Sequence, residues 1–279
     1  MSGKRLLLQP LPPLRQSGAR AYQGAHWRDP VHFDIGYFRG IPAAVSGVST
    51  PDDASLDITG NIDVRALIAL ENWASILQRI VGKREGAADR SWSFYIASTG
   101  KLGWNWSVDG TGATGGFNES STSPGVNDQH LWIRVTHQVN DGAGQNVVTF
   151  FTSTQPITTH PADVVWTLLS QHTNSGATSI FNSTAALQVG NNDGNELTGR
   201  AYYAEVRNSI DGNIVANPDF RYRTDFNSPT QLTDQLGKVW TINAPGYWVL
   251  PFMGAEPTYV PPPPYEYHRH RPRLVSVRY

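Results

Sequence analysis

Apolar and polar residues alternate along most of the middle of this chain. In residues 62–71, apolar side chains occupy every second position from Ile62 to Leu70, and the positions between them include Asp63 and Arg65. A period of two predicts a β-strand with one buried face. Similar runs predict further strands over residues 76–83, 91–97, 102–108, 131–139, 147–152, 164–169, 187–189, 201–207, 238–242 and 247–250. None of these runs has the period and length of a long helix, so the pattern predicts an all-β protein.

Polar turns rich in Gly, Asn and Asp separate these runs. The run that ends at Gly190 is followed by a polar turn over residues 191–195, and the run 201–207 is closed by Asp211-Gly212. Such turns supply positive φ at little cost, so we expect antiparallel hairpins on both sides of residues 201–207. Antiparallel strands that pack as two sheets leave few open edges, which predicts a jelly-roll sandwich.

Composition divides the chain into three parts. Prolines interrupt residues 1–42, whose scattered aromatic residues indicate an extended N-terminal arm that packs against the domain or a partner. Residues 43–252 hold the alternating runs and form the predicted sandwich. Residues 253–279 form a tail in which the stiff stretch Pro261–Pro264 precedes a basic, aromatic peptide. We expect residues 27–38 of the arm to be able to supply one strand.

The charges of the chain are concentrated unevenly. Residues 1–28 hold five Lys or Arg and no acid, and residues 265–279 hold four Arg and one Glu. The net charge of all 279 residues is −1, so the middle is acidic. Basic ends on an acidic body predict termini that dock onto neighbouring subunits, and solvated, disordered tails are the alternative. The docking residues that we single out are Arg5, Arg15, Trp27, Tyr265, Arg269 and Arg271.

Several classes of protein are disfavoured by composition. There is no cysteine, so the chain can form neither a disulfide nor a thiolate metal site. No run of apolar residues is long enough to insert into a membrane, and Leu6–Leu8 is too short an apolar run for a signal peptide. An acidic body repels phosphates and so disfavours binding of nucleic acid by the domain.

The order of several short motifs resembles that of a known family. They are Leu56–Asp63, a strand from Gly199 to the Val-Arg pair that ends at Arg207, the segment Asn217–Phe220, and residues 233–242. Over residues 43–250 the chain resembles the laminin-G-like, concanavalin A-like lectin/glucanase domains, as found in minor tail proteins of tailed bacteriophages. The resemblance implies a concanavalin A-like jelly-roll sandwich.

The same resemblance implies a function and a location. It implies a non-enzymatic virion protein at the tail tip, in which a lectin-like domain binds host cell-surface glycans. The termini would anchor it to other virion subunits, in an oligomeric arrangement in the particle. The alternative is a purely structural role, as a capsid decoration or a tail spacer without glycan contact.

The residues that enzymes of this fold need are not evident. A retaining glucanase needs two carboxylates a few ångströms apart, which on one strand means acids at alternating positions, and Glu205 has no acidic neighbour of this kind on its strand. The chain also lacks a Gly-x-Ser-x-Gly elbow and a Walker-type loop. We therefore expect no enzymatic activity, with glycoside hydrolysis as the less favoured alternative.

Lectins hold a sugar ring with an exposed aromatic side chain and neighbouring amides. Trp104, Trp106 and His137 share the phase of apolar residues, so we expect them in the core. Trp132 and Tyr95 lie on the opposite phase. The long polar loop 110–129 adds two further candidates, because loops of that length are often functional. The carbohydrate-binding candidates are thus Trp132, Tyr95, Phe117 and Asn118.

We expect no cofactor, with bound calcium as the alternative. Related domains hold calcium with Asp, Asn and carbonyl oxygens at loop rims. Asn191, Asp193 and Asn195 form the one such cluster that we identify, and it has a single formal charge. We favour a plain turn as the interpretation of these residues, with a calcium site as the alternative.

Overall fold

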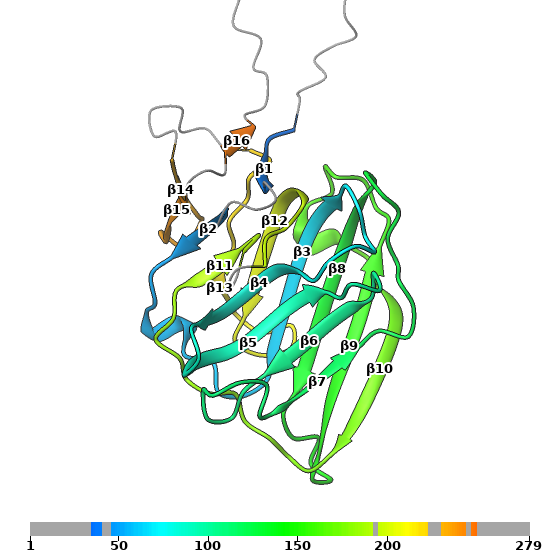
Figure 1. Cartoon of the computed structure of the whole chain (residues 1–279), viewed down its shortest axis with the longest axis vertical. Helices are drawn as coiled ribbons and strands as arrows, with labels where there is room; N and C mark the ends of the chain where they lie inside the picture. The colour runs from blue at the N-terminus through cyan, green and yellow to red at the C-terminus, as the bar shows by residue number, and fades with distance from the viewer. Residues whose placement is uncertain (1–34, 41–45, 192–194, 223–229, 244–246, 250–279) are drawn as a thin grey trace, which may run out of the picture. The chain divides into compact units, whose positions relative to one another are not determined.

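The structure is a computed structural model that describes residues 35–40, 46–191, 195–222, 230–243 and 247–249. The described residues belong to one compact unit, which contains two antiparallel sheets that face each other as layers (Figure 1). The only helices in these ranges are two short 3₁₀ turns, η1 (Ala54–Leu56) and η2 (Pro161–Asp163). The predicted all-β jelly-roll sandwich is therefore confirmed for the described part of the chain.

We call the first layer sheet A. Its strands follow the spatial order β10-β9-β8-β3-β12-β1-β16, and β13 pairs with part of β12. The strands are β1 (Tyr37–Gly40), β3 (Ile62–Leu70), β8 (His130–Gln138), β9 (Gln145–Ser153), β10 (Thr167–Ser175), β12 (Gly199–Arg207), β13 (Ile214–Ala216) and β16 (Tyr247–Val249).

The second layer is sheet B, with the spatial order β14-β15-β2-β11-β4-β5-β6-β7. Its strands are β2 (Gly47–Thr50), β4 (Gln78–Glu85), β5 (Asp89–Ile96), β6 (Leu102–Trp106), β7 (Gly116–Glu119), β11 (Leu187–Val189), β14 (Gln231–Thr233) and β15 (Val239–Asn243). The predicted 110–129 loop thus contains a strand, β7. In sheet A, β10 begins at Thr167, three residues later than the predicted run.

The main core lies between the sheets and is rich in tryptophan. Trp104 stacks on Trp92 with ring centroids 5.4 Å apart, and Trp106 lies 4.3 Å from the His137 ring. Trp104 Nε1 donates a hydrogen bond of 3.3 Å to Nδ1 of His137, whose side chain is fully buried. The expectation that Trp104, Trp106 and His137 are core residues is confirmed.

Two predictions about the strands are corrected by the structure. The segment 191–198 does not close a hairpin, because β11 pairs with β2 and β4 in sheet B while β12 lies in sheet A. The hairpin expected at Asp211-Gly212 does form, between β12 and β13. In β3 both faces are buried, not one. On the face away from the core, Leu67 and Ala69 belong to a second apolar cluster that includes Val164 from the segment before β10.

The sandwich also begins earlier than residue 43, where we expected the boundary. Tyr37–Gly40 forms β1, which pairs with both β12 and β16. Backbone pairing on both sides makes this segment an interior strand of sheet A instead of part of an arm. Residues 1–34 and 41–42 of the predicted arm and the tail from residue 253 lie outside the described residues.

We predict that His137 makes folding sensitive to mild acid. Burial lowers the pKa of His137 from its ordinary value to about 4, although a hydrogen bond with Asn146 opposes the shift. As the pH falls below about 6.5 the unfolded chain takes up a proton at this residue and the folded chain does not, so stability is lost until the pH reaches the folded value. Between about pH 7.5 and about pH 5 the loss from this residue is about 2 kcal/mol.

The variant His137→Gln, which keeps an acceptor for Trp104 and does not titrate, is the control. Urea unfolding at both pH values should show the wild type losing about 2 kcal/mol more than the variant. Equal losses would show that His137 is not held neutral in the folded protein.

Candidate functional site

The outer face of sheet A, which points away from the main core, carries charged side chains in a row across adjacent strands. Glu205 of β12 is paired in register with Arg65 of β3, and Arg65 with Arg134 of β8. All three side chains are buried. Buried charges need partners, so the contacts of this row decide how the face is built.

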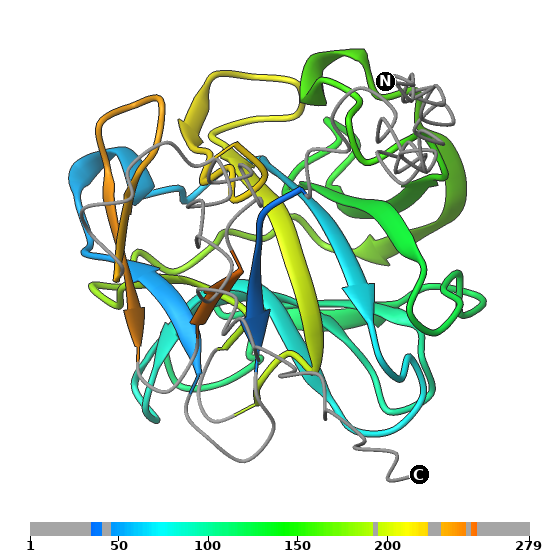
Figure 2. The same ribbon diagram turned by 90° about the horizontal axis from the view of Figure 1, so that it is seen from above.

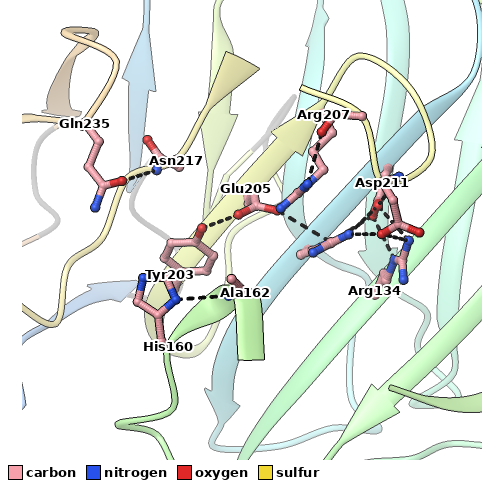
Figure 3. Close-up of polar contacts among 12 residues, drawn as sticks. Arg134, His160, Ala162, Tyr203, Glu205, Arg207, Asp211, Asn217 and Gln235 are labelled. Atoms are coloured by element: carbon pink, nitrogen blue, oxygen red, sulfur yellow. Dashed lines mark hydrogen bonds and ion pairs between the residues drawn. The ribbon is translucent and has the colours of Figure 1, made fainter. Parts of the chain in front are cut away.

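Asp63 neutralises two of these arginines. Its carboxylate accepts hydrogen bonds from Nη2 of Arg65 and Nη2 of Arg134, both at 2.7 Å, and the Nε atoms of both arginines donate to it as well. Asp211, at the tip of the β12–β13 hairpin, accepts from the same two Nη2 atoms (Figure 3). Burial opposes ionisation of Asp211, but the two arginines outweigh it and lower its pKa. The hairpin tip is thereby held against the sheet.

Glu205 sits at the other end of this row and is fully engaged. One oxygen accepts a hydrogen bond from the Tyr203 hydroxyl, and the other accepts from Nε of Arg207 at 2.5 Å (Figure 3). Arg65 Nε lies 3.5 Å from the same carboxylate. Burial, reinforced by the nearby Glu205 charge, raises the pKa of Tyr203. The phenol therefore acts as a hydrogen-bond donor to this carboxylate.

Arg221 fixes the loop between β9 and η2 onto this face. Its guanidinium forms a two-pronged ion pair with Asp219, at 2.9 and 2.8 Å, and donates to the backbone carbonyls of Ile157 and Thr159. The central carbon of the guanidinium, Cζ, lies 5.4 Å from the Trp132 ring centroid. Bidentate pairing and stacking are both properties of a planar guanidinium, so one side chain joins the loop to β8 and to the 219–221 segment.

A cavity of about 330 Å³ opens beside Arg221. Its lining comes from β12, from the segment after β13, from η2 and from the turn after β14. Tyr222 borders this cavity and is 54% exposed, with its ring 5.0 Å from the Arg221 guanidinium. The lining residues on which the argument depends are His160, Tyr203, Arg207, Asn217, Tyr222 and Gln235.

Amide and imidazole groups of the lining are fixed by short local contacts. Nδ2 of Asn217 donates to Oε1 of Gln235 at 3.1 Å, so that amide is oriented by its neighbour. Nδ1 of His160 accepts from the Ala162 backbone N–H at 3.3 Å, where His160 caps η2 (Figure 3). Beyond these contacts, His160 and Gln235 each have one further nitrogen, Nε2, that can form a hydrogen bond. The cavity thus combines an exposed aromatic ring with oriented polar groups.

Two of the four sequence-predicted carbohydrate residues are buried. Trp132 is packed under Arg221 and Tyr203, and its indole N–H donates to the Pro156 carbonyl at 3.4 Å. Tyr95 lies flat over Gly103, where an added Cβ would be 2.2 Å from the ring. Burial raises the pKa of Tyr95 to about 12. Neither ring is presented for a sugar to stack on, which corrects that expectation.

The other two candidates lie at an edge of the sandwich. Asn118 of β7 exchanges amide hydrogen bonds with Asn174 of β10, at 3.2 and 3.0 Å, and so joins sheet B to sheet A. Phe117 is 67% exposed. The structure does not bring these residues together with Trp132 or Tyr95 in a described cavity, and Phe117 remains a separate candidate surface.

The calcium and anchoring predictions remain predictions. Asn191 is buried and Asn195 is half-buried, while Asp193 lies outside the described residues. Within the described ranges, no three His, Cys, Asp or Glu side chains form a group suited to a metal ion. The docking residues all lie outside these ranges: Arg5, Arg15, Trp27, Tyr265, Arg269 and Arg271. No helix among the described residues is long and apolar enough to cross a membrane.

Comparison with known proteins supports the fold. No family model and no curated protein matches the sequence. A structure of a candidate carbohydrate-binding protein from Bacteroides ovatus superimposes with a TM-score of 0.52 at 10% identity, covering 77% of this chain and 60% of that one. This chain therefore spans less than two thirds of that protein, and at this identity the likeness concerns the fold.

Two further structures match less closely. The sialidase CBM40 domain of Ruminococcus gnavus, solved with α2,3-sialyllactose, gives a TM-score of 0.42 at 10% identity over 62% of this chain and 90% of that one. A botulinum neurotoxin type C structure, described in terms of interaction with two ganglioside molecules, gives a TM-score of 0.38 at 12% identity. The match covers 61% of this chain and 36% of that one.

We predict that Arg221 is a major source of stability. Arg221→Met keeps much of the apolar stem but leaves Asp219 without its ion pair and two loop carbonyls without donors. The free energy of unfolding should therefore fall by about 3 to 5 kcal/mol. Arg39→Met is the matched control, because Arg39 and its partner Glu71 are both partly exposed. That change should cost no more than about 1 kcal/mol. Equal costs in urea unfolding would contradict the role given to Arg221.

Proposed function

We propose that the sandwich binds a glycan in the cavity beside Tyr222. The observation that carries this proposal is the exposed Tyr222 ring at the rim of a cavity whose other walls hold His160 and Gln235. An aromatic ring packs against the apolar face of a sugar, and fixed polar groups bond its hydroxyls. The shared fold with the Bacteroides ovatus candidate carbohydrate-binding protein supports the assignment.

The geometry favours binding without catalysis. The two carboxylates that line the cavity are Glu205 and Asp219, and protein donors occupy both oxygens of each. In most glycosidase families, hydrolysis requires one carboxyl group that gives a proton to the leaving oxygen and another that attacks or activates water. Carboxylates committed to Arg207, Arg221 and Tyr203 instead hold the walls in place. A glycoside hydrolase is therefore the less favoured candidate.

Binding is tested with two exposed aromatic residues as a matched pair. Tyr222→Ala should weaken binding to host-envelope glycans at least tenfold, about 1.4 kcal/mol, because it removes the stacking surface. Phe117→Ala removes an exposed ring of similar size at the β7 edge and should leave the affinity unchanged. The measurement is titration on a glycan array, followed by calorimetry with the best ligand.

If Phe117→Ala weakens binding and Tyr222→Ala does not, the glycan site lies at β7. If neither substitution changes the affinity, the ligand lies elsewhere on the domain. If the folded wild-type protein binds no envelope glycan, the glycan-binding proposal fails and a structural role becomes the better account.

We also propose that the protein is part of a tailed-phage virion, at the tail tip, with the lectin-like domain directed at host cell-surface glycans. The support is the motif order that resembles minor tail proteins and the two basic ends of the chain. Its partners would be neighbouring virion subunits, in an oligomeric arrangement. A capsid decoration or tail spacer remains the second candidate, supported by the same basic ends.

The location is tested on purified particles. Antibody against the sandwich should label one end of the tail in electron micrographs of intact particles. Label on the capsid or along the tail shaft, together with no glycan binding, would favour the structural alternative. Particles without the protein would contradict the virion proposal altogether.

A further inference from the structure

A second cavity, of about 410 Å³, opens where β9 ends and β8 begins. Val126 borders it and is 57% exposed, which provides an apolar surface. The polar lining residues on which the argument depends are Asp128, Gln129, His130 and Thr154. Apolar surface beside a few polar groups is the composition of a small-molecule site. This cavity is separate from the one beside Tyr222, because the two share no lining residue.

The segment that carries these polar groups is held by backbone contacts. Asp128 has a φ of 61°, and its N–H donates to the Leu70 carbonyl at 2.7 Å. Just before it, the Asn127 side chain accepts from the Trp73 N–H at 3.0 Å. The Gln129 side chain is exposed and has no hydrogen-bond partner among the described residues. Its amide can therefore bond a ligand from a fixed position on the chain.

One loop, residues 154–160, reaches from one cavity to the other. Thr154 lines the second cavity, and Thr158 and His160 line the first. Exposure alternates along the loop: residues 154, 156, 158 and 160 are exposed, and the three residues between them are half-buried. The loop thus presents two hydroxyl groups and an imidazole to solvent between the two cavities.

The other side of this loop is fixed to the sandwich. Arg221 donates to the carbonyls of Ile157 and Thr159, at 2.8 and 2.9 Å. The Trp132 indole N–H donates to the Pro156 carbonyl at 3.4 Å, and the Ile157 side chain packs against the cluster that contains Trp132. A surface that is ordered before the ligand arrives loses little conformational entropy on binding.

The two cavities are close enough to be reached by one ligand. β12 lines the first, β8 begins at the second, and β3 alone lies between these strands (Figure 2 shows β12 in yellow beside β3 in cyan). Neighbouring strands lie about 4.8 Å apart, so β12 and β8 are about 10 Å apart. The loop between the cavities spans at most about 22 Å. One sugar ring cannot occupy both cavities, whereas several linked rings can.

We propose that the two cavities are subsites of one site for an extended, neutral oligosaccharide that lies across residues 154–160. This inference rests on the glycan-binding function proposed above. The carboxylates of the first cavity are paired with arginines, and Asp128 is the one charged residue in the lining of the second. Its carboxylate repels acidic sugars, so a neutral chain is favoured.

The test measures how affinity depends on the length of the glycan. The probes are short and long fragments, separated by size after partial acid hydrolysis of the envelope glycan that binds best on the array. Once one cavity is filled, the rest of a long fragment is held beside the second at a high effective concentration. Wild-type protein should therefore bind the long fragments at least tenfold more tightly than the short ones.

The double variant Gln129→Ala/Thr154→Val removes two hydrogen-bonding groups from the second cavity. It should lose about tenfold in affinity for the long fragments and none for the short ones. Gln145→Ala is the matched control, because it removes an exposed glutamine at the opposite end of β9. Equal urea midpoints show that both variants fold. Long fragments that bind no better than short ones, or a double variant that matches the wild type on them, would overturn the proposal.

Tyr222→Ala separates this inference from the proposed function, because it should weaken the binding of both fragment sizes. If it does so while fragment length has no effect, the glycan site beside Tyr222 stands and the second subsite is wrong. If it affects neither size, the proposed function is wrong, and this inference with it. Long fragments whose primary hydroxyls are oxidised to carboxylates should bind more weakly; tighter binding would contradict the neutral assignment.

Discussion

Arg221 is the side chain on which the outer face of sheet A depends. Its guanidinium pairs with Asp219, holds the carbonyls of Ile157 and Thr159, and packs against Trp132. Its own carbonyl accepts the Gly36 N–H just before β1. Because a charge this deeply buried is costly unless every donor is used, the loop, the cavity wall and the first strand are fixed relative to one another.

The charged side chains in the row beside Arg221 are also paired with one another. Asp63 and Asp211 together balance Arg65 and Arg134. Glu205 balances Arg207, so little net charge is left on this part of the sheet. Because these groups engage one another, the ring of Tyr222 and the Nε2 atoms of His160 and Gln235 are the groups that remain available in the proposed site. A surface of this kind suits a neutral, hydroxyl-rich molecule better than a reaction that moves protons.

Local sequence predicted what depends on local physics. Alternation identified β3 and β8, and the phase of Trp104, Trp106 and His137 placed them in the core, because the side-chain period of a strand is fixed by its geometry. The alternating pattern did not predict the burial of Trp132, because it shows which face of the sheet a residue is on and not what covers that face. The covering group, Arg221, comes from a segment 89 residues further along the chain.

Other features left no readable local signal. The segment after β11 contains the residues of a hairpin turn, yet the chain crosses from one sheet to the other there, which only long-range pairing decides. Tyr222 follows an irregular segment without alternation, so neither its exposure nor its cavity was predictable. The pairing of β1 with β16 joins residues more than 200 positions apart, which is beyond any pattern in a short window.

The most direct test of this account is a crystal structure of the protein with an envelope oligosaccharide that binds it in solution. The account predicts that a sugar ring packs on Tyr222, with its hydroxyls bonded to His160 or Gln235, while Arg221 keeps its contacts with Asp219. A ligand bound at Phe117 or on another face, with the cavity beside Tyr222 unoccupied, would contradict it.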